Sequence, residues 1–268
     1  ETALSPTLQG WGKHCMRPPQ INFHSAVPLA GSTLQLDVFG YTEQEPAQVQ
    51  RLESAQSQAK LLIGLDECFA VTPGARGQCS RVSAFLIGPT TAPTAVAYFA
   101  QQRCIEIGLP PEALSRLGLC SRELLNRVVT LDALWGAPAR RWMEQLQEAS
   151  TWAQRQQIAA EFLRQRLDRQ ALPVPSLSAR ACALLRLSHG QIKMARLAQT
   201  LGCSPRHLQS SFQNEIGLPP KALAGLLRYE FAAQALTRAP LRSLAEVAMD
   251  AGYSDQRHLT RAFKHYAG

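Results

Sequence analysis

The sequence contains no long hydrophobic run, and none of its apolar segments approaches the roughly 20 residues that a membrane-spanning helix needs. Its first residues, ETALSPTLQG, also lack the basic-then-apolar order of a secretory signal peptide. We therefore expect a cytoplasmic protein that does not contact membranes. The chain begins at Glu1 rather than at methionine, and we expect that its N-terminus was trimmed or processed.

Patterns that carry covalent or metal chemistry are missing as well. The seven cysteines are odd in number and scattered, and no two form the C-x-x-C pair that is typical of zinc sites. Reduced thiols without a function are the simplest interpretation, with a thiol sensor as the alternative. There is no G-x-S-x-G, P-loop, H-E-x-x-H or G-x-G-x-x-G motif, and carboxylates such as Asp66 and Glu67 stand in no catalytic pattern. We expect no catalytic residues, no metal and no cofactor, so the protein is not expected to be an enzyme.

Negative charge is scarce in the last third of the chain. Residues 178–268 contain 12 Lys and Arg but only 5 Asp and Glu, a surplus of seven positive charges. Residues 1–177 contain 16 basic and 15 acidic residues, so nearly all of the net charge of +8 lies at the C-terminal end. A local surplus of this kind favours a module that binds a polyanion such as nucleic acid.

Two prolines mark the predicted boundary between two domains. In DRQALPVPSLSA, residues 168–179, two prolines stop any continuing helix, so this segment is the predicted linker. Before it, Trp142, Leu146 and Ala149 recur at helical spacing, and Ile158, Phe162 and Leu163 do so after a break near Ser150, which indicates a helical pair. The predicted domains are 1–167 and 180–268.

The first domain is predicted to begin with strands. Leu34, Leu36 and Val38 alternate with polar residues, and KLLIGL, SRVSAFLIG and PTAVAYFAQQRCIEIGL are short apolar segments bounded by Gly, Pro or Ser. The pattern predicts an α+β domain with a β-rich first part and a helical end. The basic third, in contrast, has helical periodicity throughout and predicts an all-α domain.

The basic third repeats one pattern. LGCSPRHLQSSF (201–212) and AGYSDQRHLTRAF (251–263) each contain Gly, then Ser, then His-Leu and finally Phe, and the second copy has one extra residue after its Ser. Each copy predicts a helix-turn-helix in which Gly permits a positive φ and Ser204 or Ser254 caps the second helix. Leu208 and Phe212, like Leu259 and Phe263, are expected to point inward. Between the copies, residues 220–237 predict a helix of about 27 Å.

The outward faces of the two second helices follow from this register. They carry side chains that can donate to and accept from base edges: Arg206, Gln209, Ser210 and Gln213 in the first copy, and Gln256, Arg257, Thr260, Arg261 and Lys264 in the second. A solvated basic face is the simplest alternative for one such helix, but two copies with a shared charge surplus favour DNA binding. His207 and His258 are expected to pack or hydrogen-bond beside the turns rather than to bind metal.

Residues 190–268 resemble the tandem pattern of the AraC/XylS family of bacterial transcription regulators in order and spacing. The resemblance implies that the two second helices lie in successive major grooves of double-stranded DNA. Carried over by position, the expected base-reading residues are Arg206, Gln209, Ser210, Gln256, Arg257, Thr260 and Arg261. The charge pattern adds Arg228, Arg238 and Lys264 as expected phosphate contacts. Ser210 stands where the family often has a bulkier residue, and the chain stops at Gly268 where the family continues with a short helix, so we expect that a trimmed end weakens the second unit.

Residues 121–147 resemble, more loosely, the end of a sensor-like domain that precedes such DNA-binding units, with Asp132, Trp135 and Gly136 in matching places. The resemblance implies a small-molecule effector for residues 1–167, and it leaves open RNA polymerase and a second copy of the chain as partners. Trp135 is expected in the core rather than stacked on a ligand. The alternative is a ligand-binding or enzymatic N-terminal domain whose helical partner serves protein contacts. The effector, the operator and the choice between activation and repression stay open.

Overall fold

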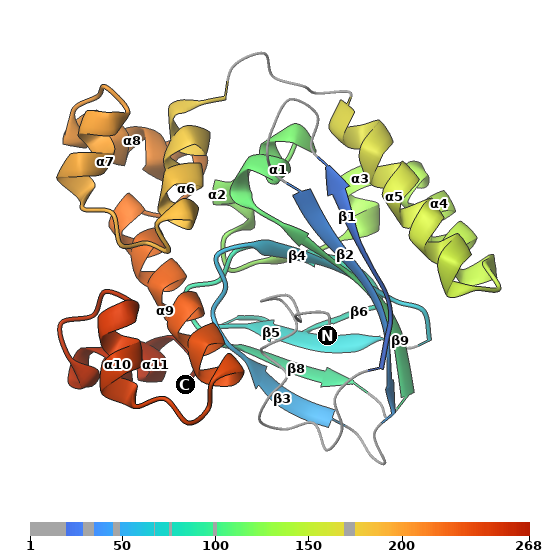
Figure 1. Cartoon of the computed structure of the whole chain (residues 1–268). Coiled ribbons are helices and arrows are strands. Elements are labelled where there is room, and N and C mark those ends of the chain that lie inside the picture. The colour runs from blue at the N-terminus through green and yellow to red at the C-terminus, as the bar shows by residue number, and fades with distance from the viewer. Residues whose placement is uncertain are drawn as a thin grey trace.

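The computed structural model describes residues 20–28, 35–44, 49–66, 68–74, 77–98, 101–168 and 175–268. A β-sandwich with helices packed on one side forms the N-terminal part, and a separate group of helices forms the C-terminal part (Figure 1). The predicted combination of an α+β domain with an all-α domain is therefore confirmed. Leu34 and residues 169–174 of the predicted linker lie outside the described residues.

The sandwich consists of two antiparallel sheets. The larger sheet has the order β1-β2-β9-β4-β7-β10 and the smaller one the order β3-β8-β5-β6. The strands of the larger sheet are β1 (Gln20–Pro28), β2 (Gln35–Gln44), β4 (Ala59–Gly64), β7 (Ala84–Ile87), β9 (Gln101–Leu109) and β10 (Val128–Thr130). Those of the smaller sheet are β3 (Val49–Glu53), β5 (Phe69–Pro73), β6 (Ser80–Val82) and β8 (Thr94–Tyr98).

Strand β9 shows how the alternating sequence produces two cores. Side chains of successive strand residues point to opposite faces of a sheet. Ile105 and Ile107 join the cluster beneath the helices, whereas Cys104 joins the cluster between the two sheets. Between the sheets, Phe69 lies 5.7 Å from both Phe85 and Tyr98, measured between ring centroids.

Five helices end the N-terminal part: α1 (Pro111–Arg116), α2 (Ser121–Leu124), α3 (Leu131–Trp135), α4 (Ala137–Glu148) and α5 (Trp152–Asp168). Helices α4 and α5 form the predicted helical pair, with the break at 149–151, and α5 packs against β1 and β2. Trp135 is partly buried in this layer, 5.6 Å from the Phe162 ring and beneath the Arg166 guanidinium. The expectation that Trp135 is a core residue is confirmed.

The C-terminal part is helical, as the sequence predicts. Its helices are α6 (Leu177–Leu187), α7 (Met194–Thr200), α8 (Pro205–Glu215), α9 (Pro220–Arg238), α10 (Leu244–Asp250) and α11 (Gln256–Tyr266). Helix α5 ends at Asp168 and α6 begins at Leu177, with Ser176 as its N-cap. None of the helices in the described ranges is both long and apolar enough to cross a bilayer.

We predict that Trp142→Ala lowers the free energy of unfolding by about 3–5 kcal/mol, the usual cost of removing a large aromatic side chain from a core. Trp142 is 1% exposed and stacks on Phe162 with ring centroids 4.0 Å apart. Urea denaturation followed by circular dichroism measures the change. Leu187→Ala is the control, because Leu187 is 79% exposed and should change stability by less than about 0.5 kcal/mol. Equal, small effects of both substitutions would contradict the packing described.

Candidate nucleic-acid interface and ligand cavity

The first helix-turn-helix consists of α7 and α8. Gly202, in the turn, has a φ of +68°, a conformation that side-chain-bearing residues rarely adopt. The Ser204 hydroxyl accepts the backbone N–H of His207 at 3.1 Å and so caps α8. Leu208 and Phe212 are 2% and 0% exposed, so they fix the inward face of α8 as predicted.

The second helix-turn-helix consists of α10 and α11 and differs at its cap. Gly252 has a φ of +72°, and Leu259 is buried, while Phe263 is only partly buried. The prediction that Ser254 caps α11 is wrong: Asp255 is the N-cap and accepts the His258 N–H at 2.7 Å. The extra residue in this copy moves the cap one position along the chain, and the Ser254 hydroxyl contacts His258 Nδ1 instead, at 3.2 Å.

The faces of α8 and α11 that the sequence assigns to DNA are open to solvent. All seven expected base-reading residues are exposed: Arg206, Gln209, Ser210, Gln256, Arg257, Thr260 and Arg261. A broad, open depression of about 820 Å³ is lined by Asp255, Gln256, Arg257, Thr260 and Arg261. Helices α8 and α11 pack near opposite ends of α9 (Figure 1).

The arginine side chains on these faces have no hydrogen-bonding or ion-pair partner within the described part of the chain. Among the described residues, the guanidinium groups of Arg206, Arg257 and Arg261 make no hydrogen bond or ion pair, so they can bind a ligand without breaking an internal contact. Thr260 differs, because its hydroxyl donates to the Gln256 carbonyl at 2.9 Å. The Thr260 hydroxyl therefore has no proton left to donate to a ligand and can only accept.

The three expected phosphate contacts lie in different surroundings. Arg238 and Lys264 are exposed. Arg228 is partly buried, with its guanidinium 5.5 Å from the centre of the Tyr253 ring. Burial raises the pKa of Tyr253 to about 12, and Arg228 acts against this rise. Arg228 thus packs α9 against the second unit, a position that sequence reasoning did not foresee.

The histidines of the two copies also differ. His207 is exposed, whereas His258 is partly buried and meets the Tyr253 ring edge-on at 5.0 Å. The described residues include no group of three or more His, Cys, Asp or Glu side chains that could hold a metal ion. His258 packs on Tyr253 and contacts the Ser254 hydroxyl beside its turn, as expected, whereas His207 is exposed.

Comparison with known proteins identifies this part of the chain. Residues 197–268 match the family model of a helix-turn-helix domain. The C-terminal part of the chain is an AraC-type helix-turn-helix domain. No curated protein matches the sequence.

Solved structures extend the likeness to the whole fold. The crystal structure of ToxT from Vibrio cholerae O395 is similar with a TM-score of 0.51 and 8% identity, over 87% of this chain and 94% of that one. An unsaturated fatty acid-bound ToxT from V. cholerae strain SCE256 has a TM-score of 0.49 and 11% identity, over 87% and 91% of the two chains. The AraC-like transcriptional activator CuxR has 13% identity and a TM-score of 0.34, over 71% and 73%. At these identities the likeness to ToxT shows a common fold: a β-rich N-terminal part followed by an AraC-type domain.

The interior of the sandwich contains a charged cavity that sequence reasoning missed. It encloses about 40 Å³. Its lining includes Arg51, Glu53, Lys60, Thr94 and Glu106, together with apolar side chains from both sheets. Arg51 pairs with Glu43 and Glu53 at 3.2 and 2.5 Å, and Lys60 pairs with Glu106 at 3.2 Å. Burial raises the pKa of both Glu43 and Glu106, while Arg51 and Lys60 respectively act against this rise.

One wall of this cavity also holds the AraC-type domain. The connection between β3 and β4 contributes Ser54 and Gln56 to the cavity. In the same connection, the Ser57 N–H and hydroxyl donate to the two carboxylate oxygens of Glu230 on α9, at 2.6 and 2.7 Å. The Ala55 N–H donates to the Tyr266 carbonyl at 2.7 Å. We call these three bonds the clasp.

Apolar contacts surround the clasp. Ala55 is buried with Leu226 and Tyr229 of α9 in a small hydrophobic cluster between the two parts of the chain. Burial raises the pKa of Glu230, and the bonds from Ser57 act against this rise. The positions of residues 57 and 230, 173 residues apart, give no sequence signal that they meet.

A second contact joins the two parts near the start of α9. Helix α2 lies against α8, and Leu125 packs onto the core of the first unit. Gly217, at a φ of +85°, allows close approach, because a Cβ there would lie 2.9 Å from the Arg122 Cα. The expected base-reading residues of α8 remain exposed beside this contact.

We predict that the stability of the second unit falls at low pH through Asp255. The N–H of His258 holds the pKa of Asp255 below its ordinary value. This stabilisation is complete above the unfolded-state pKa of about 3.9 and is lost as the pH falls through the lower folded-state pKa. The difference in unfolding free energy between wild type and Asp255→Asn, measured by urea denaturation, should therefore shrink from about pH 5 to about pH 2.5.

Ser204→Ala is the control for this measurement. It should retain the pH dependence of the wild type, because Ser204 caps α8 in the first unit rather than α11. An Asp255→Asn variant whose stability follows that of wild type at every pH would show that the carboxylate does not cap α11.

Proposed function

We propose that the protein is a sequence-specific, DNA-binding transcription regulator whose helices α8 and α11 enter two successive major grooves. The observation that carries the proposal is the pair of exposed faces near opposite ends of α9, whose Arg206, Arg257 and Arg261 make no hydrogen bond or ion pair among the described residues. Helix α9 has 19 residues and is therefore about 28 Å long, close to the roughly 34 Å between adjacent major grooves.

Each of the two faces would contact base edges in one major groove. Arg206, Gln209 and Ser210 would contact base edges in one groove; Gln256, Arg257, Thr260 and Arg261 would do so in the next. Arg238 and Lys264 are exposed and suited to phosphates, which set affinity but not sequence. Arg228 would reach a phosphate only from the edge of its contact with Tyr253.

We further propose that a small molecule entering the sandwich cavity modulates DNA binding. At about 40 Å³ the cavity holds little more than one water molecule, so a ligand must push the sheets apart. Because Ser54, Gln56 and Ser57 belong to one short connection, such widening would move the clasp and with it α9. The effector would thus change the relation of the AraC-type domain to the sandwich.

In this proposal residues 1–167 form the regulatory domain, residues 168–179 form the linker and residues 180–268 form the DNA-binding domain. The protein would act without catalysis, in the bacterial cytoplasm, where the chromosome lies. Transcription itself requires RNA polymerase as a further partner, and a second copy of the chain would bind a second DNA site. A module for protein contacts is the rival function. It would show no steep dependence of DNA affinity on salt, whereas a module that neutralises phosphates must.

We predict that Arg261→Ala weakens binding to the cognate duplex by about 1–3 kcal/mol and leaves binding to random duplex nearly unchanged. Fluorescence anisotropy across a salt series measures both affinities, on a site selected from random DNA. Arg140→Ala, an exposed arginine substitution on α4, serves as the control and should change neither affinity. Equal losses on both duplexes would remove Arg261 from the base-reading set.

We predict that Glu230→Ala lowers the free energy of unfolding by about 1–3 kcal/mol, because the Ser57 N–H loses its acceptor. Hydrogen–deuterium exchange should show faster exchange at residues 54–57, and amides within α7 should keep their wild-type rates. Glu161→Ala, on the exposed side of α5, is the matched control. Unchanged exchange at 54–57 would mean that the clasp does not hold the two parts together.

A further inference from the structure

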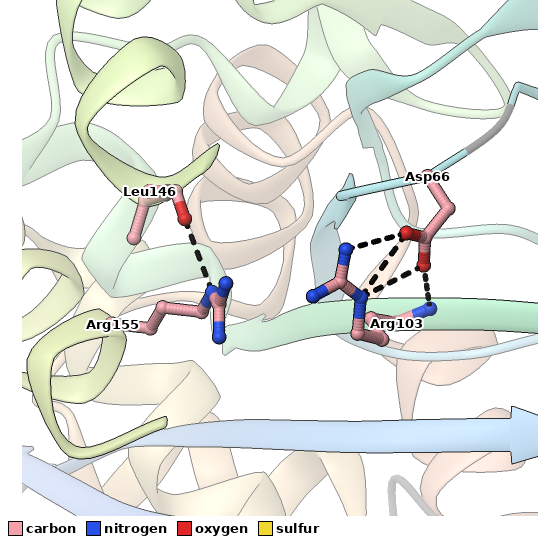
Figure 2. Close-up of polar contacts among 4 residues, drawn as sticks. All are labelled: Asp66, Arg103, Leu146 and Arg155. Carbon is pink, nitrogen blue, oxygen red and sulfur yellow. Dashed lines mark hydrogen bonds and ion pairs between the residues drawn. The ribbon is translucent and has the colours of Figure 1, made fainter. Parts of the chain in front are cut away.

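A cluster of charges outside both sites described above lies where the α4–α5 pair meets the start of β9. The Asp66 carboxylate accepts the Arg103 backbone N–H at 2.7 Å and binds the Arg103 guanidinium through Nε and Nη2, with a shortest distance of 2.7 Å. Arg155, on α5, projects toward this pair, and Figure 2 shows the two guanidinium groups facing each other.

The Arg155 side chain is buried without a carboxylate. The residue is only 5% exposed. Its Nε donates to the Leu146 carbonyl at 3.1 Å, and its guanidinium lies 5.2 Å from the centre of the Trp152 ring. These contacts join α5 to the end of α4, but they leave both terminal nitrogens of Arg155 without a partner among the described residues.

The charges in the cluster do not balance. The cluster holds two guanidinium groups and one carboxylate, and that carboxylate is already bound by Arg103. Burial lowers the pKa of Arg155, and Arg103 lowers it further, while Asp66 acts against the decrease. A buried guanidinium beside a second cation is unfavourable unless an anion neutralises it.

We propose that Arg155 and Arg103 form a binding site for one oxyanion group of a small ligand, with a carboxylate fitted best by the single surplus charge. The two Nη atoms of Arg155 form a planar fork that matches the two oxygens of a carboxylate, and Arg103 Nη1 remains available beside it. Solvent reaches the cluster through Arg103, whose side chain is 45% exposed. The site is separate from the DNA-reading faces and from the sandwich cavity, and does not depend on the function proposed for either.

The test uses the full chain and three sodium salts. Thermal unfolding is followed with increasing acetate or phosphate, and chloride keeps the ionic strength constant. A bound anion raises the unfolding midpoint along a saturating curve. We expect saturation in wild type, loss of the response in Arg155→Met and a reduced response in Arg155→Lys, which keeps the charge but lacks the fork. Arg164→Met, an exposed arginine on the same helix, is the matched control and should respond like wild type.

The outcomes separate the possible explanations. Saturation by acetate alone supports a carboxylate site, and saturation by both anions supports a general oxyanion site. A rise that never saturates and is equal in all variants is the ordinary effect of excluded salts, and it would overturn the proposal. A lower midpoint for Arg155→Met with an unchanged acetate response would show that Arg155 only joins α4 to α5.

A second measurement covers the case in which Arg155→Met does not fold. Nuclear magnetic resonance of the arginine side-chain N–H groups in wild type should show acetate-dependent shifts for Arg155 and Arg103 that saturate together. Shifts absent from both arginines at saturating acetate would contradict the site.

Discussion

Helix α9 packs into three hydrophobic clusters at once, and the arrangement of the whole chain depends on that constraint. Leu223 and Leu227 belong to the core of the first helix-turn-helix, Tyr229 to the cluster against the sandwich, and Ala232 to the core of the second. A helix is stiff over this length, so its side chains fix the spacing of the two units and their position beside the sandwich together. Glu230 adds a polar contact with Ser57 at the middle of this stiff element. A movement of the β3–β4 connection therefore reaches both units through one helix.

The charged side chains inside the sandwich lower the stability of the fold in a way that apolar side chains at the same positions would not. Glu43, Glu106, Arg51 and Lys60 occupy positions between two sheets, where desolvation of a charge is expensive and pairing recovers only part of the loss. Replacing such pairs by apolar residues often stabilises a protein. Their presence next to a cavity is understandable if a ligand supplies further hydrogen bonds, and the unpaired Thr94 hydroxyl in the same lining is a polar group available to it.

The sequence allowed the C-terminal half to be predicted in detail, because its information is local. Gly202 and Gly252 mark turns, the spacing of Leu208 and Phe212 fixes a helix face, and the exposed residues follow from that register. One error, Ser254 in place of Asp255 as the cap, arose at the position where the second copy has an extra residue, and the partial burial of Arg228 against Tyr253 was also not foreseen. Strands β1, β3, β5 and β10 were not predicted, whereas β2, β4 and β6 to β9 were recognisable from alternation or from short apolar segments. Their order, the cavity, the clasp and the Arg103–Arg155 cluster were not, because each depends on residues that lie far apart in the sequence and carry no local pattern. Ser57 with Glu230 and Asp66 with Arg103 are examples.

Changing the distance between the two halves of a bound DNA site tests most directly whether α9 holds α8 and α11 at a fixed spacing. Duplexes selected from random DNA would be compared with versions carrying insertions of about 5 and about 10 base pairs between the halves, a half and a full helical turn. If α9 holds the units at a fixed distance, both insertions should reduce the affinity to that of a duplex with a single half. An unchanged affinity with either insertion, or recovery at the full turn, would contradict a rigid pair that reads two adjacent grooves.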